Sequence, residues 1–368
     1  EVGKTPYRFQ VKKGGKPIDV KVRLSGYKEE TRTITPREDQ TLELTLTKEA
    51  PSEPPPPVDT GSKPKKGKPV KELTAAETKP AKAKEPAADA ETKPAKGKEK
   101  PGLLDKDGRI RDLSKVVGDI GGDVLSPASL NKLRKLNPEK LPLVKGRPRI
   151  GACVANPQKF IAIGLNYSDH AAESGLAVPP EPVVFTKQVS CVSGPNDDVT
   201  IPPKSKKSDW EVELGVIIGS RAKNIRKADA LKHVAGYCTV NDLSEREFQA
   251  ERAGQWTKGK SYDTFGPIGP WLVTADEVKN PQNLHLWLEL NGKRVQDGNT
   301  KTMVFGVAHI VAYLSQFFTL MPGDIITTGT PPGVGMGMKP QRFLKPGDRM
   351  VIGIDGLGVQ HQVVRRDR

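Results

Sequence analysis

The sequence contains few cysteines and few aromatic residues. Its 368 residues include three cysteines, and aromatic side chains make up only 5% of the chain. The cysteines, Cys153, Cys191 and Cys238, are far apart and form no C-x-x-C pair. This spacing argues against a disulfide-stapled scaffold and is typical of a reducing compartment, so we expect a cytoplasmic protein.

Uninterrupted apolar segments of membrane-spanning length are also lacking. The chain does not open with a charged segment followed by an apolar one, so the sequence predicts no signal peptide. The most apolar run is 304–321, which His309, Ser315 and Gln316 interrupt and a Pro-Gly-Asp turn at 322–324 ends. We interpret this run as a buried helix rather than a membrane span.

Charge of one sign is not concentrated in any part of the chain. The formal net charge is +15, but residues 1–50 carry 11 basic and 8 acidic side chains, residues 51–100 carry 12 and 8, and the remainder carries 36 and 28. An excess spread in this way is typical of a solvated basic surface rather than of a stripe that binds phosphates. A nucleic-acid partner is therefore not expected.

Residues 49–100 have an unusual composition. They include a proline run at 54–57, are then dominated by Lys, Ala, Pro and Glu, and contain no Ile, Phe, Tyr, Trp or Met. Such a segment cannot bury enough apolar surface to offset its conformational entropy, so it is predicted to be a disordered linker. Because acidic residues are interspersed among the lysines, a solvated tether is favoured over a nucleic-acid-binding tail.

Two smaller regions flank this linker. Residues 1–48 alternate apolar and polar residues in three short stretches, which predicts a small β module. Residues 101–158 are interpreted as a small N-terminal subdomain. It contains a strand, an Asp-Gly turn at 107–108, a second strand and a helix capped by Ser126.

Strand patterns dominate residues 159–368. Six or more apolar, β-branched stretches occur against three or four helical ones, which predicts a mainly β domain with a few helices, in the α+β class. The strand candidates are 160–165, 183–185, 211–218, 234–240, 284–290, 325–328 and 350–354, and the helix candidates are 228–233, a segment after Asp242, and 304–321.

Three carboxylates in this region could bind a metal ion. Glu211 and Glu213 lie two residues apart within the run 209–219, so they should share one face of a strand, and Asp242 ends another strand. Three carboxylate ligands suit Mg²⁺ or Mn²⁺ better than zinc. Taken one at a time, the ordinary interpretations are a solvated strand face for the glutamates and a helix N-cap for Asp242.

Three more side chains are candidates for catalysis. His170 and Glu173 are three residues apart, so on a helix they form the His–carboxylate pair typical of a general base acting on water, although a surface pair has the same spacing. Lys260 could stabilise an enolate or oxyanion, although a lone lysine is ordinarily solvated. The glycine-rich stretch 329–337 lacks the Gly-Lys-Ser/Thr ending of a phosphate loop, so we expect close backbone approach to a small substrate rather than nucleotide binding.

A set of short motifs occurs in order along residues 102–365. They are Gly164-Leu165-Asn166-Tyr167, Glu181-Pro182-Val183, Glu211-x-Glu213-Leu214-Gly215, Asn241-Asp242, Lys260-Ser261, Gly266-Pro267, Asn291-Gly292 and Thr328-Gly329-Thr330-Pro331-x-Gly333-Val334-Gly335. Because of these motifs, the region resembles the fumarylacetoacetate hydrolase family. Within that family it is most similar to the hydrolases of 2,4-diketo-3-deoxy sugar acids, such as the L-fuconate and L-rhamnonate derivatives. Residues 1–48, with a Gly-Lys-Thr-Pro opening and a Gly-Tyr turn, resemble a PEGA-type module.

The family resemblance implies a fold and a set of roles. The implied fold of residues 159–368 is a mixed β-sandwich roll, usually dimeric, preceded by a small subdomain. The implied metal ligands are Glu211, Glu213 and Asp242; the implied catalytic residues are the water-activating pair His170 and Glu173, on a lid-like segment, and Lys260; and the implied substrate-binding residues are Arg246, Gln249 and Thr330.

These expectations combine into one functional hypothesis. The chain is expected to be a Mg²⁺- or Mn²⁺-dependent hydrolase that cleaves a C–C bond in a 2,4-diketo acid, an acylpyruvate or a diketo-deoxy sugar acid, into pyruvate and a carboxylic acid. Its expected partners are this small 2-oxo or 2,4-dioxo acid and a second copy of the chain. The alternatives are an oxo-diacid decarboxylase or tautomerase, a ureidoglycolate lyase and, from another class, a non-enzymatic scaffold or nucleic-acid-binding protein.

Overall fold

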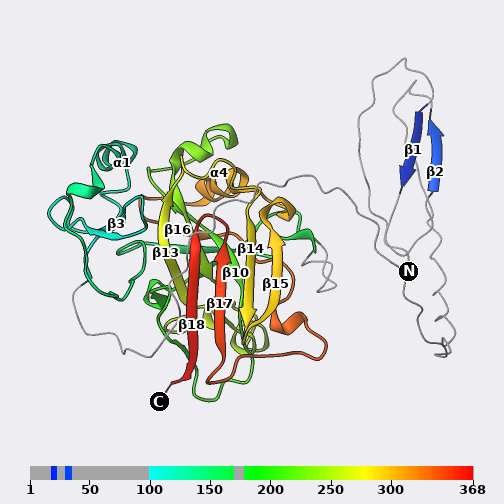
Figure 1. Cartoon of the computed structure of the whole chain (residues 1–368). Coiled ribbons are helices and arrows are strands. Elements are labelled where there is room, and N and C mark those ends of the chain that lie inside the picture. The colour runs from blue at the N-terminus through cyan, green and yellow to red at the C-terminus, as the bar shows by residue number, and fades with distance from the viewer. Residues whose placement is uncertain (1–17, 23–29, 35–98, 170–177, 368) are drawn as a thin grey trace, which may run out of the picture. The chain divides into compact units, whose positions relative to one another are not determined.

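A computed structural model of the chain describes residues 18–22, 30–34, 99–169 and 178–367 (Figure 1). The chain divides into two compact units, Glu1–Ala87 and Ala88–Arg368. In the first unit, β1 (Ile18–Val22) pairs antiparallel with β2 (Glu30–Ile34), so Ile18 lies opposite Ile34. β1 lies within one of the three stretches whose alternation predicted strands, and the other two lie outside the described residues, as does most of the predicted linker.

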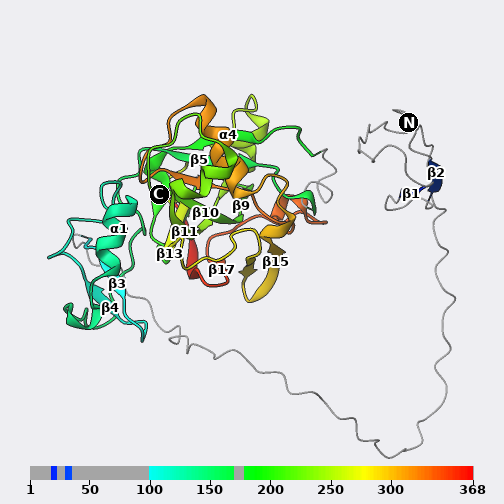
Figure 2. The same ribbon diagram turned by 90° about the horizontal axis from the view of Figure 1, so that it is seen from above.

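The second unit begins with a small hairpin and a helix. β3 (Gly102–Leu104) and β4 (Ile110–Asp112) pair antiparallel across the predicted Asp-Gly turn. Helix α1 (Pro127–Arg134) begins after Ser126, whose side chain accepts a hydrogen bond from the amide of Ser129, and a short 3-10 helix, η1 (Pro138–Lys140), follows. Figure 2 shows α1, β3 and β4 beside the larger sheets.

Seven strands form the larger sheet, and its two central strands are buried along their whole length. The strand order is β6-β5-β16-β10-β11-β13-β7, with both parallel and antiparallel pairs. A strand buried on both faces needs apolar residues at nearly every position, and the sequences of β10 and β11 fit this requirement. The bounds are β5 (Phe160–Gly164), β6 (Val183–Lys187), β7 (Val192–Ser193), β10 (Val212–Ile218), β11 (Val234–Asn241), β13 (Gly266–Thr274) and β16 (Ile325–Thr327).

A five-stranded sheet packs against the larger one. Its order is β15-β14-β17-β18-β8, and β14, β17 and β18 contact β10 and β11 across the interface (Figure 1). Along β14 buried and half-buried residues alternate, so Leu286, Leu288 and Leu290 enter the core. The bounds are β8 (Val199–Ile201), β14 (His285–Leu290), β15 (Lys293–Asn299), β17 (Arg349–Ile354) and β18 (Gly358–Arg366). The predicted mainly β, sandwich-like fold class is therefore confirmed.

Most helices of the second unit are short. The apolar run is found as α4 (Val307–Phe317), which buries Ile310, Val311 and Leu314. Among the described residues, no helix has the length and apolar character needed to span a bilayer. The other helical segments in the described residues of this unit are the 3-10 helices η2 (Val189–Cys191), η3 (Lys227–His233), η5 (Thr300–Thr302) and η6 (Gly335–Gly337), the π-helix η4 (Glu247–Glu251), and α3 (Thr257–Lys260).

A separate two-stranded sheet brings together two segments that are distant in the sequence, next to the start of β10. β9 (Ser208–Asp209) pairs antiparallel with β12 (Ser244–Glu245), which places Asp209 opposite Ser244. The sequence predicted a helix after Asp242, and η4 and α3 do follow, but residues 244–245 first extend into β12. The reason is tertiary, because the backbone of 244–245 finds its partner in β9 before the chain turns into η4.

The hairpin β3–β4 is held by a buried carboxylate. Asp105 accepts hydrogen bonds from Nε of Arg109 at 2.9 Å and from Nε of Arg111 at 2.8 Å. Burial raises the pKa of Asp105, but the hydrogen bonds from Arg109 and Arg111 more than offset this, so the pKa lies well below its ordinary value. The folded hairpin therefore favours the ionised carboxylate.

Replacing Asp105 with asparagine should lower the unfolding temperature at neutral pH by roughly 3 °C or more, because both arginines lose a charged acceptor. A carboxyl group whose pKa is lowered by folding stabilises the protein above its unfolded pKa, about 4, and this contribution is lost as the pH falls through the folded pKa. The difference between wild type and Asp105→Asn in thermal unfolding should therefore shrink below about pH 4. A difference that does not change with pH would contradict this assignment.

Candidate metal centre

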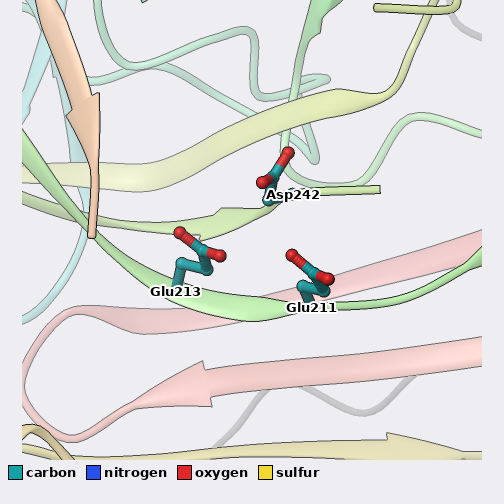
Figure 3. A group of neighbouring side chains, drawn as sticks. All are labelled: Glu211, Glu213 and Asp242. Atoms are coloured by element: carbon teal, nitrogen blue, oxygen red, sulfur yellow. The ribbon is translucent and has the colours of Figure 1, made fainter. Parts of the chain in front are cut away.

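Three carboxylates converge where β10 begins and β11 ends (Figure 3). Glu211 directly precedes β10, Glu213 lies within it, and Asp242 directly follows β11. The pairing of Val212 with Asn241 sets these positions side by side, and the amide of Asp242 donates to the carbonyl oxygen of Glu211 at 2.9 Å. One oxygen of each carboxylate lies within 4.8 Å of those of the other two, and all three side chains are buried.

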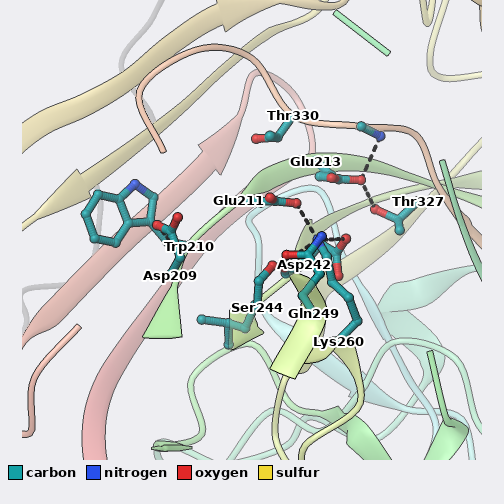
Figure 4. A network of polar contacts seen from close by, with 12 residues as sticks. Asp209, Trp210, Glu211, Glu213, Asp242, Ser244, Gln249, Lys260, Thr327 and Thr330 are labelled. Atoms are coloured by element: carbon teal, nitrogen blue, oxygen red, sulfur yellow. Dashed lines mark hydrogen bonds and ion pairs between the residues drawn. The ribbon is translucent and has the colours of Figure 1, made fainter. Parts of the chain in front are cut away.

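Three buried cations contact these carboxylates, and Figure 4 shows one of them, Lys260, beside Glu211 and Asp242. Lys260, at the end of α3, places Nζ 2.7 Å from Oε2 of Glu211 and 2.7 Å from Oδ2 of Asp242. Lys187, at the end of β6, places Nζ 2.6 Å from Oδ1 of Asp242. Arg246 places Nη2 2.7 Å from Oε1 of Glu211. Burial lowers the pKa of Lys260, but the charges of Asp242 and Glu211 outweigh it and raise the pKa above its ordinary value.

Glu213 is held from the opposite side. Its Oε2 accepts a hydrogen bond from Oγ1 of Thr327 at 2.5 Å and from the amide of Gly329 at 2.7 Å. Burial raises the pKa of Glu213 well above its ordinary value, and the charges of Asp242 and Glu211 raise it further. A charge at this position is therefore costly, and a divalent cation among the three carboxylates would offset that cost.

The donor set fits a hard divalent cation. Carboxylate oxygens are the ligands that Mg²⁺ and related ions prefer, and here they come from the ends of two paired strands, which are rigid elements. Among the described residues this is the group of carboxylates whose spacing can hold an ion. The neighbouring lysines do not neutralise the negative charge of the whole cluster. Glu213 contacts a hydroxyl and an amide rather than a cation.

The structure brings Arg246 and Gln249 together at the start of the π-helix η4. Nη1 of Arg246 lies 3.0 Å from Oε1 of Gln249, and both side chains are buried. Gly259 allows α3 to pack closely against η4, because a Cβ at residue 259 would lie 2.5 Å from the amide nitrogen of Gln249. Arg246 thus contacts both a predicted metal ligand and a predicted substrate-binding residue.

Thr330 lies in the loop after β16, above Glu211 in Figure 4. Its hydroxyl donates to the carbonyl oxygen of Val212 at 2.9 Å and accepts from Nε2 of Gln296 at 2.8 Å. A hydroxyl has a single hydrogen to donate, so the Thr330 side chain as placed has no donor left for a substrate. A contact of Thr330 with substrate would therefore use its backbone amide or the remaining lone pair.

His170 and Glu173, the predicted water-activating pair, lie outside the described residues. The residues directly before them are described. Asn166 donates to the carbonyl oxygen of Thr328 at 2.7 Å, and Tyr167 is fully buried. The Tyr167 hydroxyl has no hydrogen-bond partner in the described part of the chain, and its pKa is raised well above the ordinary value by burial and by the charge of Glu213. The segment that leads to His170 therefore starts close to the carboxylates.

Two residues at the site were not among the sequence-based candidates. Lys187 extends the strand pattern 183–185, and period-2 alternation places it on the same buried face as Phe185. Asp209 stands two residues before Glu211 and is fully buried. In both cases the sequence places a charged residue at a strand position that is expected to be buried. Because such residues are almost never buried unpaired, this pattern could have identified both as members of a polar site.

A divalent cation should stabilise the wild-type protein but not the variant Glu213→Gln. The substitution keeps the size of the side chain and removes one of three ligand charges. At a concentration ~100 times its dissociation constant, Mg²⁺ or Mn²⁺ should stabilise the wild type by about 2.7 kcal/mol, seen as a rise in unfolding temperature. Glu289→Gln, a glutamate on β14 that pairs with Arg294, serves as the control and should keep the rise. An equal rise in Glu213→Gln would remove Glu213 from the metal site.

Comparison with known proteins supports an enzyme. A Burkholderia multivorans protein, named provisionally as a hydrolase, is 64% identical over 270 residues, which are 73% of this chain and 96% of that protein. The solved structure of a fumarylacetoacetate hydrolase from the psychrophile Exiguobacterium antarcticum is 32% identical, with a TM-score of 0.64 over 74% of this chain and 98% of its own. A 2-hydroxyhepta-2,4-diene-1,7-dioate isomerase from Mycobacterium marinum is 36% identical, with a TM-score of 0.51 over 57% of this chain and 75% of its own.

Two family models match the chain. The PEGA domain model matches residues 1–50, which confirms the resemblance noted for 1–48. The model described as fumarylacetoacetate (FAA) hydrolase C-terminal matches residues 159–365, a range that includes both sheets and all three clustered carboxylates. The chain therefore belongs to the fumarylacetoacetate hydrolase family.

Proposed function

We propose that the protein is a metal-dependent hydrolase that cleaves a C–C bond in a 2,4-dioxo acid, such as an acylpyruvate or a diketo-deoxy sugar acid. The observation that carries this proposal is the buried cluster Glu211, Glu213 and Asp242 with Lys260 lying between two of its members. Membership of a hydrolase family and a relative named as a hydrolase support an enzyme rather than a scaffold. Mg²⁺ is the proposed ion, with Mn²⁺ as its close chemical equivalent.

A bound divalent ion would polarise the carboxylate and 2-oxo oxygens of the substrate. Arg246 and Gln249, beside Glu211, are proposed to bind the substrate carboxylate. His170, oriented by Glu173, takes a proton from a water, and the oxygen of that water attacks the distal carbonyl carbon. The bond between this carbon and C3 then breaks, its electron pair passes into a pyruvate enolate, and Lys260 stabilises the enolate charge. Protonation at C3 gives pyruvate, and the distal fragment leaves as a carboxylic acid.

A second candidate reaction has a specific observation in its favour. One of the similar structures is named as a 2-hydroxyhepta-2,4-diene-1,7-dioate isomerase, and isomerisation of a dioxo acid proceeds through the same kind of enolate. Decarboxylation of an oxo-diacid uses it as well, and a ureidoglycolate lyase activity is a further alternative. The fold does not separate these reactions, because unrelated chemistries share one scaffold.

Product analysis decides between these reactions. A panel of 2,4-dioxo acids incubated with the protein and Mg²⁺ should give pyruvate and a second carboxylic acid in equal amounts. Release of carbon dioxide with no second acid would show decarboxylation, and a product isomeric with the substrate would show isomerisation. Either result would replace the proposed hydrolysis.

Replacing His170 with alanine should reduce turnover of an accepted dioxo acid by ~10² or more, because water would lose its general base. Divalent-cation binding, followed by thermal unfolding, should be unchanged, since the proposed ligands are untouched. The matched control is His285→Ala on β14, a half-exposed histidine beside Asp297 that should leave turnover unaltered. Full activity in His170→Ala would remove this residue from the mechanism.

A homodimer also remains part of the proposal. It follows from the family resemblance alone, and a mass of about twice the 40.0 kDa chain in light scattering would support it.

A further inference from the structure

Asp209 is a fully buried carboxylate to which the proposed mechanism gives no role. It belongs to the same polar network as Glu211 (Figure 4). Its Oδ1 accepts hydrogen bonds from the amides of Gly335 at 2.7 Å and Trp210 at 2.9 Å. Its Oδ2 accepts hydrogen bonds from the amide of Met336 at 2.9 Å and from Nε of Arg246 at 2.9 Å, and Nη2 of Arg246 forms an ion pair with it at 2.8 Å. Asp209 is thus fixed by three backbone amides and is independently paired with one guanidinium.

Arg246 divides its charge between Asp209 and Glu211. Nη2 lies 2.8 Å from Oδ2 of Asp209 and 2.7 Å from Oε1 of Glu211, while Nε faces Asp209 alone. Burial lowers the pKa of Arg246, but the charges of Asp209 and Glu211 more than offset this and raise the pKa above its ordinary range. The two carboxylates therefore compete for one cation.

The position of Asp209 does not depend on that arginine. The tight loop at Gly335 comes so close that a Cβ there would lie 1.8 Å from the carbonyl oxygen of Arg342 and 2.8 Å from Oδ1 of Asp209. The pairing of β9 with β12 places Asp209 opposite Ser244, two residues before Arg246. Backbone contacts therefore hold the Asp209 carboxylate in position without help from Arg246. A counter-ion can orient its partner only if its own position is fixed in this way.

The charge balance shows what Asp209 changes. Among the described residues, two of the three clustered carboxylates, Glu211 and Asp242, contact three buried cations, which are Lys187, Lys260 and Arg246. With Arg246 directed only at Glu211, these cations would match the three ligand charges and leave little attraction for a divalent ion. A fourth buried carboxylate, Asp209, lies against two nitrogens of the arginine and so restores negative charge to the ligand set.

We propose that Asp209 is a positioning residue that, as the main counter-ion of Arg246, keeps Glu211 available to a divalent cation. This inference rests on the proposed metal centre but not on the reaction catalysed there. It also gives the first residue of the Asp-x-Glu-x-Glu stretch 209–213 a function distinct from that of the two ligands.

The test measures Mn²⁺ affinity directly, with no substrate, by titration with detection of free Mn²⁺ by electron paramagnetic resonance. Asp209→Asn should bind Mn²⁺ ~10-fold more weakly than the wild type, because Arg246 then turns its full charge to Glu211. Asp105→Asn is the matched control, because it removes a buried carboxylate between two arginines at the β3–β4 hairpin. It should lower stability and leave Mn²⁺ affinity unchanged.

A second pair of variants separates action through Arg246 from loss of a nearby charge. Arg246→Gln alone should bind Mn²⁺ more tightly than the wild type, and adding Asp209→Asn to it should change the affinity by less than ~3-fold. If Asp209→Asn does not fold, Arg246→Gln tests the same claim, and weaker or unchanged binding there overturns it. Unchanged affinity in a folded Asp209→Asn overturns the role of Asp209 alone, whereas absence of Mn²⁺ binding by the wild type overturns the metal centre and this inference together.

Discussion

The burial of three carboxylates within 4.8 Å of one another is the constraint on which the rest of the site depends. Like charges this close and this dry are costly unless cations and hydrogen-bond donors surround them. The fold supplies them from distant segments: Lys187 ends β6, Lys260 ends α3, Arg246 precedes η4, and the amide of Gly329 follows β16. The sheets hold these ends together at the junction of β10 and β11.

The same arrangement explains why one scaffold can serve several reactions. The strands hold the ligand atoms, whereas the loops and short helices carry Arg246, Gln249 and Thr330, and loops are where related proteins differ most. Relatives named as a hydrolase and as an isomerase share this fold. For this chain, our proposal is that the cluster and Lys260 stabilise an enolate and that His170 and Glu173 direct its formation by hydrolysis.

The sequence predicted best what is encoded locally. Period-2 alternation predicted that Glu211 and Glu213 point to the same side of the run that contains β10, and apolar runs predicted β11 and α4. Prediction from the sequence was less successful where contacts with a segment far away in the chain determine the local structure. Residues 244–245 extend as β12 because β9 pairs with them, and the contacts of Lys187 and Asp209 depend on segments far along the chain. The division into 1–48, 49–100, 101–158 and 159–368 and the roles of His170 and Glu173 remain predictions.

The central claim is that Glu211, Glu213 and Asp242 hold one divalent cation. Crystals grown with Mn²⁺ and measured at the manganese absorption edge would locate the ion by its anomalous scattering. We expect one strong peak within about 2.0–2.4 Å of an oxygen from each carboxylate, with Lys260 beside Glu211 and Asp242. No peak at this cluster, or a peak held by other residues, would contradict the claim.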